Sequence, residues 1–137
     1  MKTVLVFGTF DVIHPGHKYF LQQSATFGEK LIAVIARDGF VNTTKKRTPV
    51  HSQNERMEHI INSGLVDDAC LSDSVTGSFN VVEKINPQII CFGHDQIKLV
   101  DSFKSWMKQN NKNIEIKIID PYLRDRYSST IRNKKKY

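Results

Sequence analysis

The stretch KTVLVFGTFDVIHPGH, residues 2–17, joins an apolar run to a polar turn and then to the start of a helix. The run Lys2–Phe7 predicts a buried strand. Pro15 suits the first turn of a helix, where its missing N–H would have no partner in any case. We expect this helix to extend from Pro15 to Phe27 and to end before Gly28. A strand, a glycine turn and a helix in this order are typical of the opening of an α/β fold.

The rest of the chain repeats this alternation. The segment Leu31–Ala36 is apolar throughout, which indicates a strand covered on both faces. Further strands are expected at Asp68–Leu71, Gln88–Phe92 and Ile114–Ile119, and further helices at about 52–63, 77–85 and 100–109 and from Ser128 onward. The order predicts one Rossmann-like, doubly wound, five-stranded parallel sheet with helices on both faces. The length of 137 residues fits a single domain, 1–137, that ends in a basic tail at 132–137.

The composition favours an anionic partner. The chain carries 20 basic and 14 acidic side chains, a formal net charge of +6. It has neither an aromatic-interleaved basic strand nor a basic recognition helix, so we expect no nucleic-acid partner. It has no signal peptide and no run near the roughly 18 apolar residues of a membrane span. Cys70 and Cys91 lie in apolar runs and are expected to be core residues, so the sequence indicates a reducing, cytoplasmic setting without a membrane partner.

The turn at Gly8 follows the first predicted strand directly. Ligands of such sheets bind beyond the carboxyl ends of the strands, where the loops starting at Gly8, Arg37, Gly93 and Asp120 would surround one crevice. Without a Cβ, Gly8 lets a phosphate approach the backbone, and the free amides of the next helix favour an anion. The turn has neither the Walker sequence nor the dinucleotide-binding glycine pattern.

His14 and His17 are three residues apart and therefore neighbours on one face of this helix. A helix N-terminus disfavours an added positive charge, whereas a bound polyphosphate would reverse that balance. We interpret the two histidines as hydrogen-bond donors to phosphate oxygens. Two alternatives stay open: a zinc site, for which His51, His59 and Cys91 show no ligand spacing, and histidines that only cap the helix and pack.

The stretch GTFDVIHPGH resembles the signature G-T-F-D-x-x-H-x-G-H of the cytidylyltransferase-like nucleotidyltransferases. Looser matches cover most of the chain, in the basic loop, after Glu55, at GHDQ (93–96) and at SSTIR (128–132). The resemblance implies transfer of a nucleoside monophosphate from CTP or ATP to a small anionic phosphomonoester, with release of pyrophosphate. It also implies Mg²⁺ carried by the triphosphate rather than by protein ligands, and it allows a homodimer.

The resemblance further implies roles for individual residues. It casts His14 and His17 as catalytic contacts to the α-phosphate and the leaving phosphates. It assigns a catalytic lysine to the basic loop, where Lys46 matches best and Lys45 or Arg47 are alternatives. Nucleotide contacts are implied for Gly8, Thr9, Phe10, Asp11, Gly16, Gly93, Asp95, Gln96, Arg126, Ser128, Ser129 and Thr130, and further phosphate or substrate contacts for Arg124 and Arg56. Asp11 is expected to shape the turn rather than to act as a base. For Arg56 the resemblance leaves both a phosphate-binding and a structural role open.

A phosphomonoester is already anionic near neutral pH, so such a transfer needs positioning and charge neutralisation rather than a general base. Two subfamilies compete for the acceptor. Ala36-Arg37-Asp38 and Gly93-x-Asp95-Gln96 resemble archaeal-type FAD synthases, which adenylylate FMN, and we favour this interpretation. His51-Ser52 resembles glycerol-3-phosphate cytidylyltransferase, which is the alternative. A nucleotide sensor without turnover is the alternative from another functional class.

Overall fold

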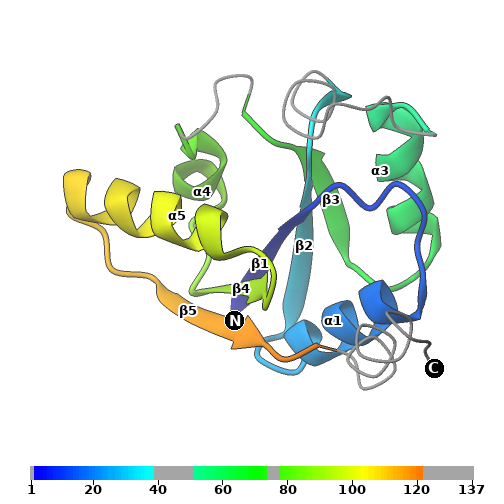
Figure 1. Ribbon diagram of the computed structural model, residues 1–137, viewed down its shortest axis with the longest axis horizontal. Helices are drawn as coiled ribbons and strands as arrows, with labels where there is room; N and C mark the ends of the chain where they lie inside the picture. Colours follow the sequence, from blue (N-terminus) through cyan, green and yellow to red (C-terminus); the bar gives the residue numbers. More distant parts are fainter. Residues whose placement is uncertain (1, 39–50, 74–77, 122–137) are drawn as a thin grey trace, which may run out of the picture.

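A computed structural model describes residues 2–38, 51–73 and 78–121 of the chain. In these residues the elements follow the order β1 (Thr3–Gly8), α1 (Pro15–Ala25), β2 (Lys30–Ile35), α3 (Gln53–Asn62), β3 (Asp68–Leu71), α4 (Asn80–Ile85), β4 (Ile89–Gly93), α5 (Ile97–Gln109) and β5 (Glu115–Ile119). The strands form one sheet in the order β3-β2-β1-β4-β5, and every neighbouring pair is parallel (Figure 1). The predicted doubly wound parallel sheet is confirmed.

Helices cover both faces of the sheet because alternate strand residues are apolar on both sides. Val4 and Val6 of β1 belong to a core that also contains Leu21 of α1 and Ile60 of α3. The residues between and beyond them turn to the opposite face, and Leu5 packs there with side chains of α4 and α5. Figure 1 shows α1 and α3 apart from α4 and α5, with the sheet between them. The central strand β1 is therefore buried on two sides, in agreement with the buried strand predicted at Lys2–Phe7.

The expected capping box starts α3. Ser52 Oγ accepts a hydrogen bond from the Glu55 amide at 3.2 Å, and Glu55 Oε1 accepts one from the Ser52 amide at 2.9 Å. The hydrogen bonds from the Ser52 backbone and side chain hold the pKa of the Glu55 carboxyl below its ordinary value. The start of this helix was therefore predictable from four consecutive residues.

Two helix starts differ from the expected ones. Helix α4 begins at Asn80 instead of near residue 77, because the Asp73 carboxylate accepts hydrogen bonds from the amides of Asn80 and Val81. Phe79, at the N-cap, has a left-handed φ of 50°. Helix α5 begins at Ile97, three residues before the expected Val100. The strand bounds agree with the expected ones to within one residue, and the helix expected after Ser128 lies outside the described residues.

The two cysteines are free thiols in the sheet. Cys91 of β4 is fully buried and Cys70 of β3 is partly buried, and burial raises the pKa of both thiols. Both are therefore poor nucleophiles at neutral pH. Among the helices of the described residues, none has the length and apolarity that crossing a bilayer requires.

Candidate functional site

The site lies where β1 and β4 stop pairing. Their register joins Val4 to Ile89, Leu5 to Ile90 and Val6 to Cys91, and both strands continue beyond it to Gly8 and Gly93. The chain runs from β1 to β2 and β3 on one side, and β4 and β5 lie on the other. The carboxyl ends of β1 and β4 thus form the switch point of the sheet, where ligands of open α/β folds bind.

The ring of Phe10 leaves no room for a side chain at position 8. A Cβ on Gly8 would lie 2.4 Å from Phe10 Cε2, which is too close for any side chain. Phe10 itself is 4% exposed, and its backbone adopts a left-handed φ of 49°. The sequence suggested a phosphate in the space beside Gly8, but the Phe10 ring fills that space. Gly8 and Phe10 could therefore contact a nucleotide only through their backbones, and the strained φ is typical of a functional turn.

His14 and His17 cap the start of α1 with their imidazoles. His14 Nδ1 accepts hydrogen bonds from the amides of Gly16, at 3.0 Å, and His17, at 3.4 Å. His17 Nδ1 in turn accepts one from the His14 amide at 3.3 Å, which completes a reciprocal capping box. The two rings stack with centroids 3.8 Å apart, and Phe10 meets His17 edge-on at 5.4 Å.

This arrangement assigns the tautomer of both rings. A ring nitrogen that accepts a hydrogen bond carries no proton, so each neutral imidazole has its proton on Nε2. Capping and ligand binding are therefore compatible roles, because they use opposite ring nitrogens. His14 is exposed and His17 is partly exposed. The first amides of α1 are already bonded to His14, so the two ring N–H groups and the helix dipole are what suit a polyphosphate here.

Arg56 joins the turn after β1 to the ends of two other elements. Its Nη1 donates to the Thr9 carbonyl at 2.8 Å, its Nε to the His51 carbonyl at 3.1 Å and its Nη2 to Asp38 Oδ1 at 2.7 Å. The side chain is fully buried. These contacts favour the structural role that the sequence left open for Arg56 over a direct phosphate contact.

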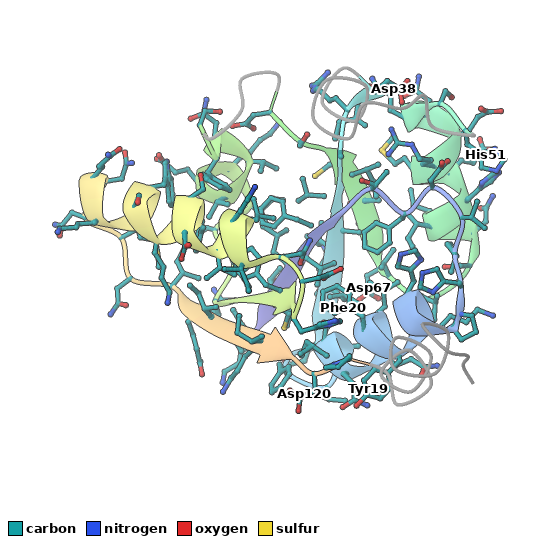
Figure 2. All side chains as sticks on the ribbon, in the orientation of Figure 1. Tyr19, Phe20, Asp38, His51, Asp67 and Asp120 are labelled. Carbon is teal, nitrogen blue, oxygen red and sulfur yellow. The ribbon has the colours of Figure 1, made fainter. Side chains whose placement is uncertain are left out.

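Asp11 and Asp38 fix the same corner. Asp11 Oδ1 accepts a hydrogen bond from the His51 amide at 2.9 Å, which suits a residue that shapes the turn. Asp38 and Gln53 exchange two hydrogen bonds, from each backbone amide to the other side chain, at 2.9 and 3.1 Å. Figure 2 shows Asp38 and His51 on the α3 side of the sheet. Sequence reasoning gave Asp38 no role of its own, although an acidic residue just beyond a buried strand is a usable signal.

The loop after β4 is fixed by Gln96. Its Oε1 accepts a hydrogen bond from the Gly93 amide at 2.8 Å, and its Nε2 donates to the Phe7 carbonyl of β1 at 2.9 Å. A Cβ on Gly93 would lie 3.0 Å from Asp95 Oδ1 and 4.0 Å from Phe20 of α1. Figure 2 shows Phe20 between α1 and the sheet. The structure thus brings Gly93 and the exposed Asp95 to the edge where β1 ends.

Other predicted site residues lie outside the described residues: Lys45, Lys46, Arg47, Arg124, Arg126, Ser128, Ser129 and Thr130. Their roles stay predictions. Across the described ranges 2–38, 51–73 and 78–121, no three His, Cys, Asp or Glu side chains gather in a group that could hold a metal ion. His51 and His59, whose rings meet edge-on at 4.7 Å, belong to no such group.

Residues 5–134 match a family described as Cytidylyltransferase-like. The chain is 36% identical over 139 residues to the FAD synthase of Methanothermobacter marburgensis, covering 99% of this chain and 85% of that protein. It is 38% identical over 125 residues to the FAD synthase of Methanothermobacter thermautotrophicus, covering 89% and 82%.

Among solved structures, the lipopolysaccharide core biosynthesis protein of Thermoplasma volcanium is similar with a TM-score of 0.80 and 29% identity, over 89% of this chain and 98% of that one. Pantoate-beta-alanine ligase of Francisella tularensis has a TM-score of 0.65 at 14% identity, over 97% and 69%, and shares the fold alone.

Proposed function

The chain belongs to the cytidylyltransferase-like family and is a nucleotidyltransferase, and we propose that it transfers the AMP group of ATP to FMN, yielding FAD and pyrophosphate. The observation that supports this most is the pair of capping imidazoles at the N-terminus of α1. The relatives named FAD synthase, at 36% and 38% identity, support FMN as the acceptor. Gly93, Asp95 and Gln96 carry the motif that the sequence shares with that subfamily.

The chemistry proceeds at the α-phosphorus. A phosphate oxygen of FMN attacks this atom, the bond to the oxygen bridging the α- and β-phosphates breaks, and pyrophosphate leaves with that electron pair. The attacking oxygen is already ionised, so no side chain has to remove a proton. The Nε2–H groups of His14 and His17 and the dipole of α1 stabilise the charge that grows on the phosphate oxygens. Rigid capping through Nδ1 keeps both donors oriented before the nucleotide arrives.

The remaining components follow from the charge of the reactants. Mg²⁺ carried by the triphosphate would neutralise part of its charge. Lys46 of the basic loop adds a positive charge, with Lys45 and Arg47 as alternatives, and Arg126 with Ser128, Ser129 and Thr130 contacts the nucleotide. We place the protein in the cytoplasm as a single-domain enzyme, and the family resemblance is the support for a homodimer.

One experiment separates this proposal from its rivals. ATP and CTP are each incubated with FMN, glycerol-3-phosphate, phosphocholine or phosphoethanolamine, and pyrophosphate and the organic product are measured. We expect pyrophosphate and FAD from ATP with FMN, and loss of both in excess chelator. The matched control is His17→Asn, whose side chain can still accept at the Nδ1 position but lacks the Nε2 donor.

Each other outcome contradicts the proposal in its own way. Pyrophosphate from CTP with glycerol-3-phosphate would identify a glycerol-3-phosphate cytidylyltransferase, the subfamily that His51-Ser52 resembles. Tight nucleotide binding without pyrophosphate from any pair would identify a sensor. Full activity in excess chelator would remove Mg²⁺ from the proposal.

A further inference from the structure

Two glutamine side chains join β1 to β4, one at each end of their paired region. At the amino end, Gln88 Oε1 accepts a hydrogen bond from the Thr3 amide at 2.7 Å. At the carboxyl end, Gln96 accepts from the Gly93 amide at 2.8 Å and donates to the Phe7 carbonyl at 2.9 Å. The backbone register between the strands lies between these two contacts.

The Gln96 side chain supplies hydrogen bonds between β1 and β4 where the backbone pairing of the two strands has ended. The register between the strands ends at the pair Val6 and Cys91, so the Phe7 carbonyl and the Gly93 amide lie beyond it. A side-chain amide has one strong acceptor and two donor hydrogens, and Gln96 uses its oxygen on one strand and its nitrogen on the other. The ends of β1 and β4 are therefore linked to each other through the side-chain amide of Gln96.

We propose that Gln96 is a positioning residue that holds the two halves of the nucleotide site in register, rather than a residue that contacts the nucleotide. The first half is the turn after β1 with His14 and His17, and the second is the loop of Gly93 and Asp95. This inference rests on the proposed function in one respect, namely that a nucleotide spans both halves. It revises the nucleotide contact that the family resemblance implied for Gln96, because the amide oxygen and one amide hydrogen of Gln96 bind backbone groups of the two strands and so fix its orientation between them.

Such a bridge has a distinctive energetic signature. When two half-sites are held at a fixed separation, a ligand that spans them avoids the cost of ordering them on binding. A fragment that occupies only one half gains nothing from the fixed separation. Loss of the bridge should thus weaken the whole nucleotide more than either of its parts.

The test measures the affinities of ATP, tripolyphosphate and adenosine for the wild-type protein and for Gln96→Leu, by NMR titration. We expect Gln96→Leu to weaken ATP about tenfold, the scale of one lost hydrogen-bond constraint, and to leave tripolyphosphate and adenosine within about twofold. Gln88→Leu is the matched control, because it removes the bridge at the opposite end of the same two strands. It should leave all three affinities unchanged. Gln96→Asn is a milder second variant, since its shorter side chain cannot span both partners, and it should repeat the pattern.

The outcomes separate the inference from the proposed function. Wild-type protein that binds no ATP would refute both. Wild-type binding that Gln96→Leu and Gln96→Asn leave intact would refute the inference alone, and so would an adenosine affinity that falls together with that of ATP, because Gln96 would then contact the nucleoside. Hydrogen exchange at the Gly93 amide gives a readout that needs no nucleotide: it should accelerate in Gln96→Leu and not in Gln88→Leu.

Discussion

Arg56 Nη2 lies 2.7 Å from Asp38 Oδ1, although the Arg56 side chain has no exposed surface and that of Asp38 is 37% exposed. The same guanidinium also donates to the Thr9 carbonyl. The buried charge of Arg56 thus connects α3 to Asp38, in the segment after β2, and to Thr9, in the turn that leads to His14. The geometry of the corner that we propose binds phosphate therefore depends on a residue that is expected to touch no phosphate.

Replacing Arg56 should therefore damage stability before it damages chemistry. Arg56→Ala leaves two backbone carbonyls and a carboxylate without their donor, and we expect a loss of about 3 kcal/mol in unfolding free energy. Urea denaturation measures this loss. Arg37→Lys is the control, since Arg37 donates from Nε to the Ser72 carbonyl at 2.6 Å and should cost about 1 kcal/mol. If Arg56→Ala kept the stability of the wild type but bound triphosphate more weakly, Arg56 would contact phosphate after all.

Gly8→Ala tests the contact between Gly8 and Phe10. The new methyl group would collide with the Phe10 ring, so we expect a loss of about 2 kcal/mol in unfolding free energy, together with lower activity. Gly64→Ala is the matched control, because Gly64 has a φ of 77° and no atom within 4 Å of its would-be Cβ. Gly64→Ala should lower the unfolding free energy by about 1 kcal/mol, because only the left-handed backbone conformation is strained. If the two changes cost the same and activity is kept, the Phe10 ring does not constrain Gly8.

The start of α3 should weaken in acid. The Ser52 hydrogen bonds lower the pKa of Glu55, so its ionised form is favoured in the folded chain. Its contribution is complete above the ordinary value of 4.5 and is lost as the pH falls through the lower folded value. We expect the stability difference between wild type and Glu55→Gln to shrink as the pH is lowered below about 4.5, in thermal melts. A difference that stays constant across that range would show that Glu55 does not titrate with folding.

The fold was predictable because its signals are local. Continuous apolar runs marked the strands, and Ser52 with Glu55 marked a helix start within four residues. The start of α4 was missed because Asp73, whose carboxylate accepts hydrogen bonds from the Asn80 and Val81 amides, lies seven residues before Asn80. Long-range hydrogen bonds of this kind leave no periodic trace in a sequence.

The site was predictable as a set of loops but not as a set of contacts. Parallel topology brings the residues after β1 and β4 to one edge, so Gly8 and Gly93 could be grouped in advance. What each residue does there depends on pairs distant in sequence, such as Arg56 with Thr9 and Gln96 with Phe7. A motif names residue types and cannot show which atoms already have partners.

The basic loop carries the prediction that Lys46 acts in catalysis. Lys46→Ala should lower turnover by about 10²-fold, the scale for one lost charge-stabilising donor. Lys45→Ala is the matched control, with the same loss of charge one residue away, and it should have the smaller effect. Steady-state pyrophosphate release measures both variants. A larger loss in Lys45→Ala would move the catalytic role by one residue.

Two substitutions of His14 separate its capping role from the catalytic role that we propose for it. The Asn oxygen can replace Nδ1 as acceptor for the Gly16 amide, so His14→Asn should unfold within about 0.5 kcal/mol of the wild type. It lacks the Nε2 donor, so turnover should fall by at least about 10²-fold. In His14→Gln the amide nitrogen reaches the Nε2 position while the cap is lost, so we expect a loss of about 1 kcal/mol in stability but more residual turnover than in His14→Asn. Near-normal turnover in His14→Asn would leave His14 as a cap only, because the one function that this variant deletes would then be dispensable.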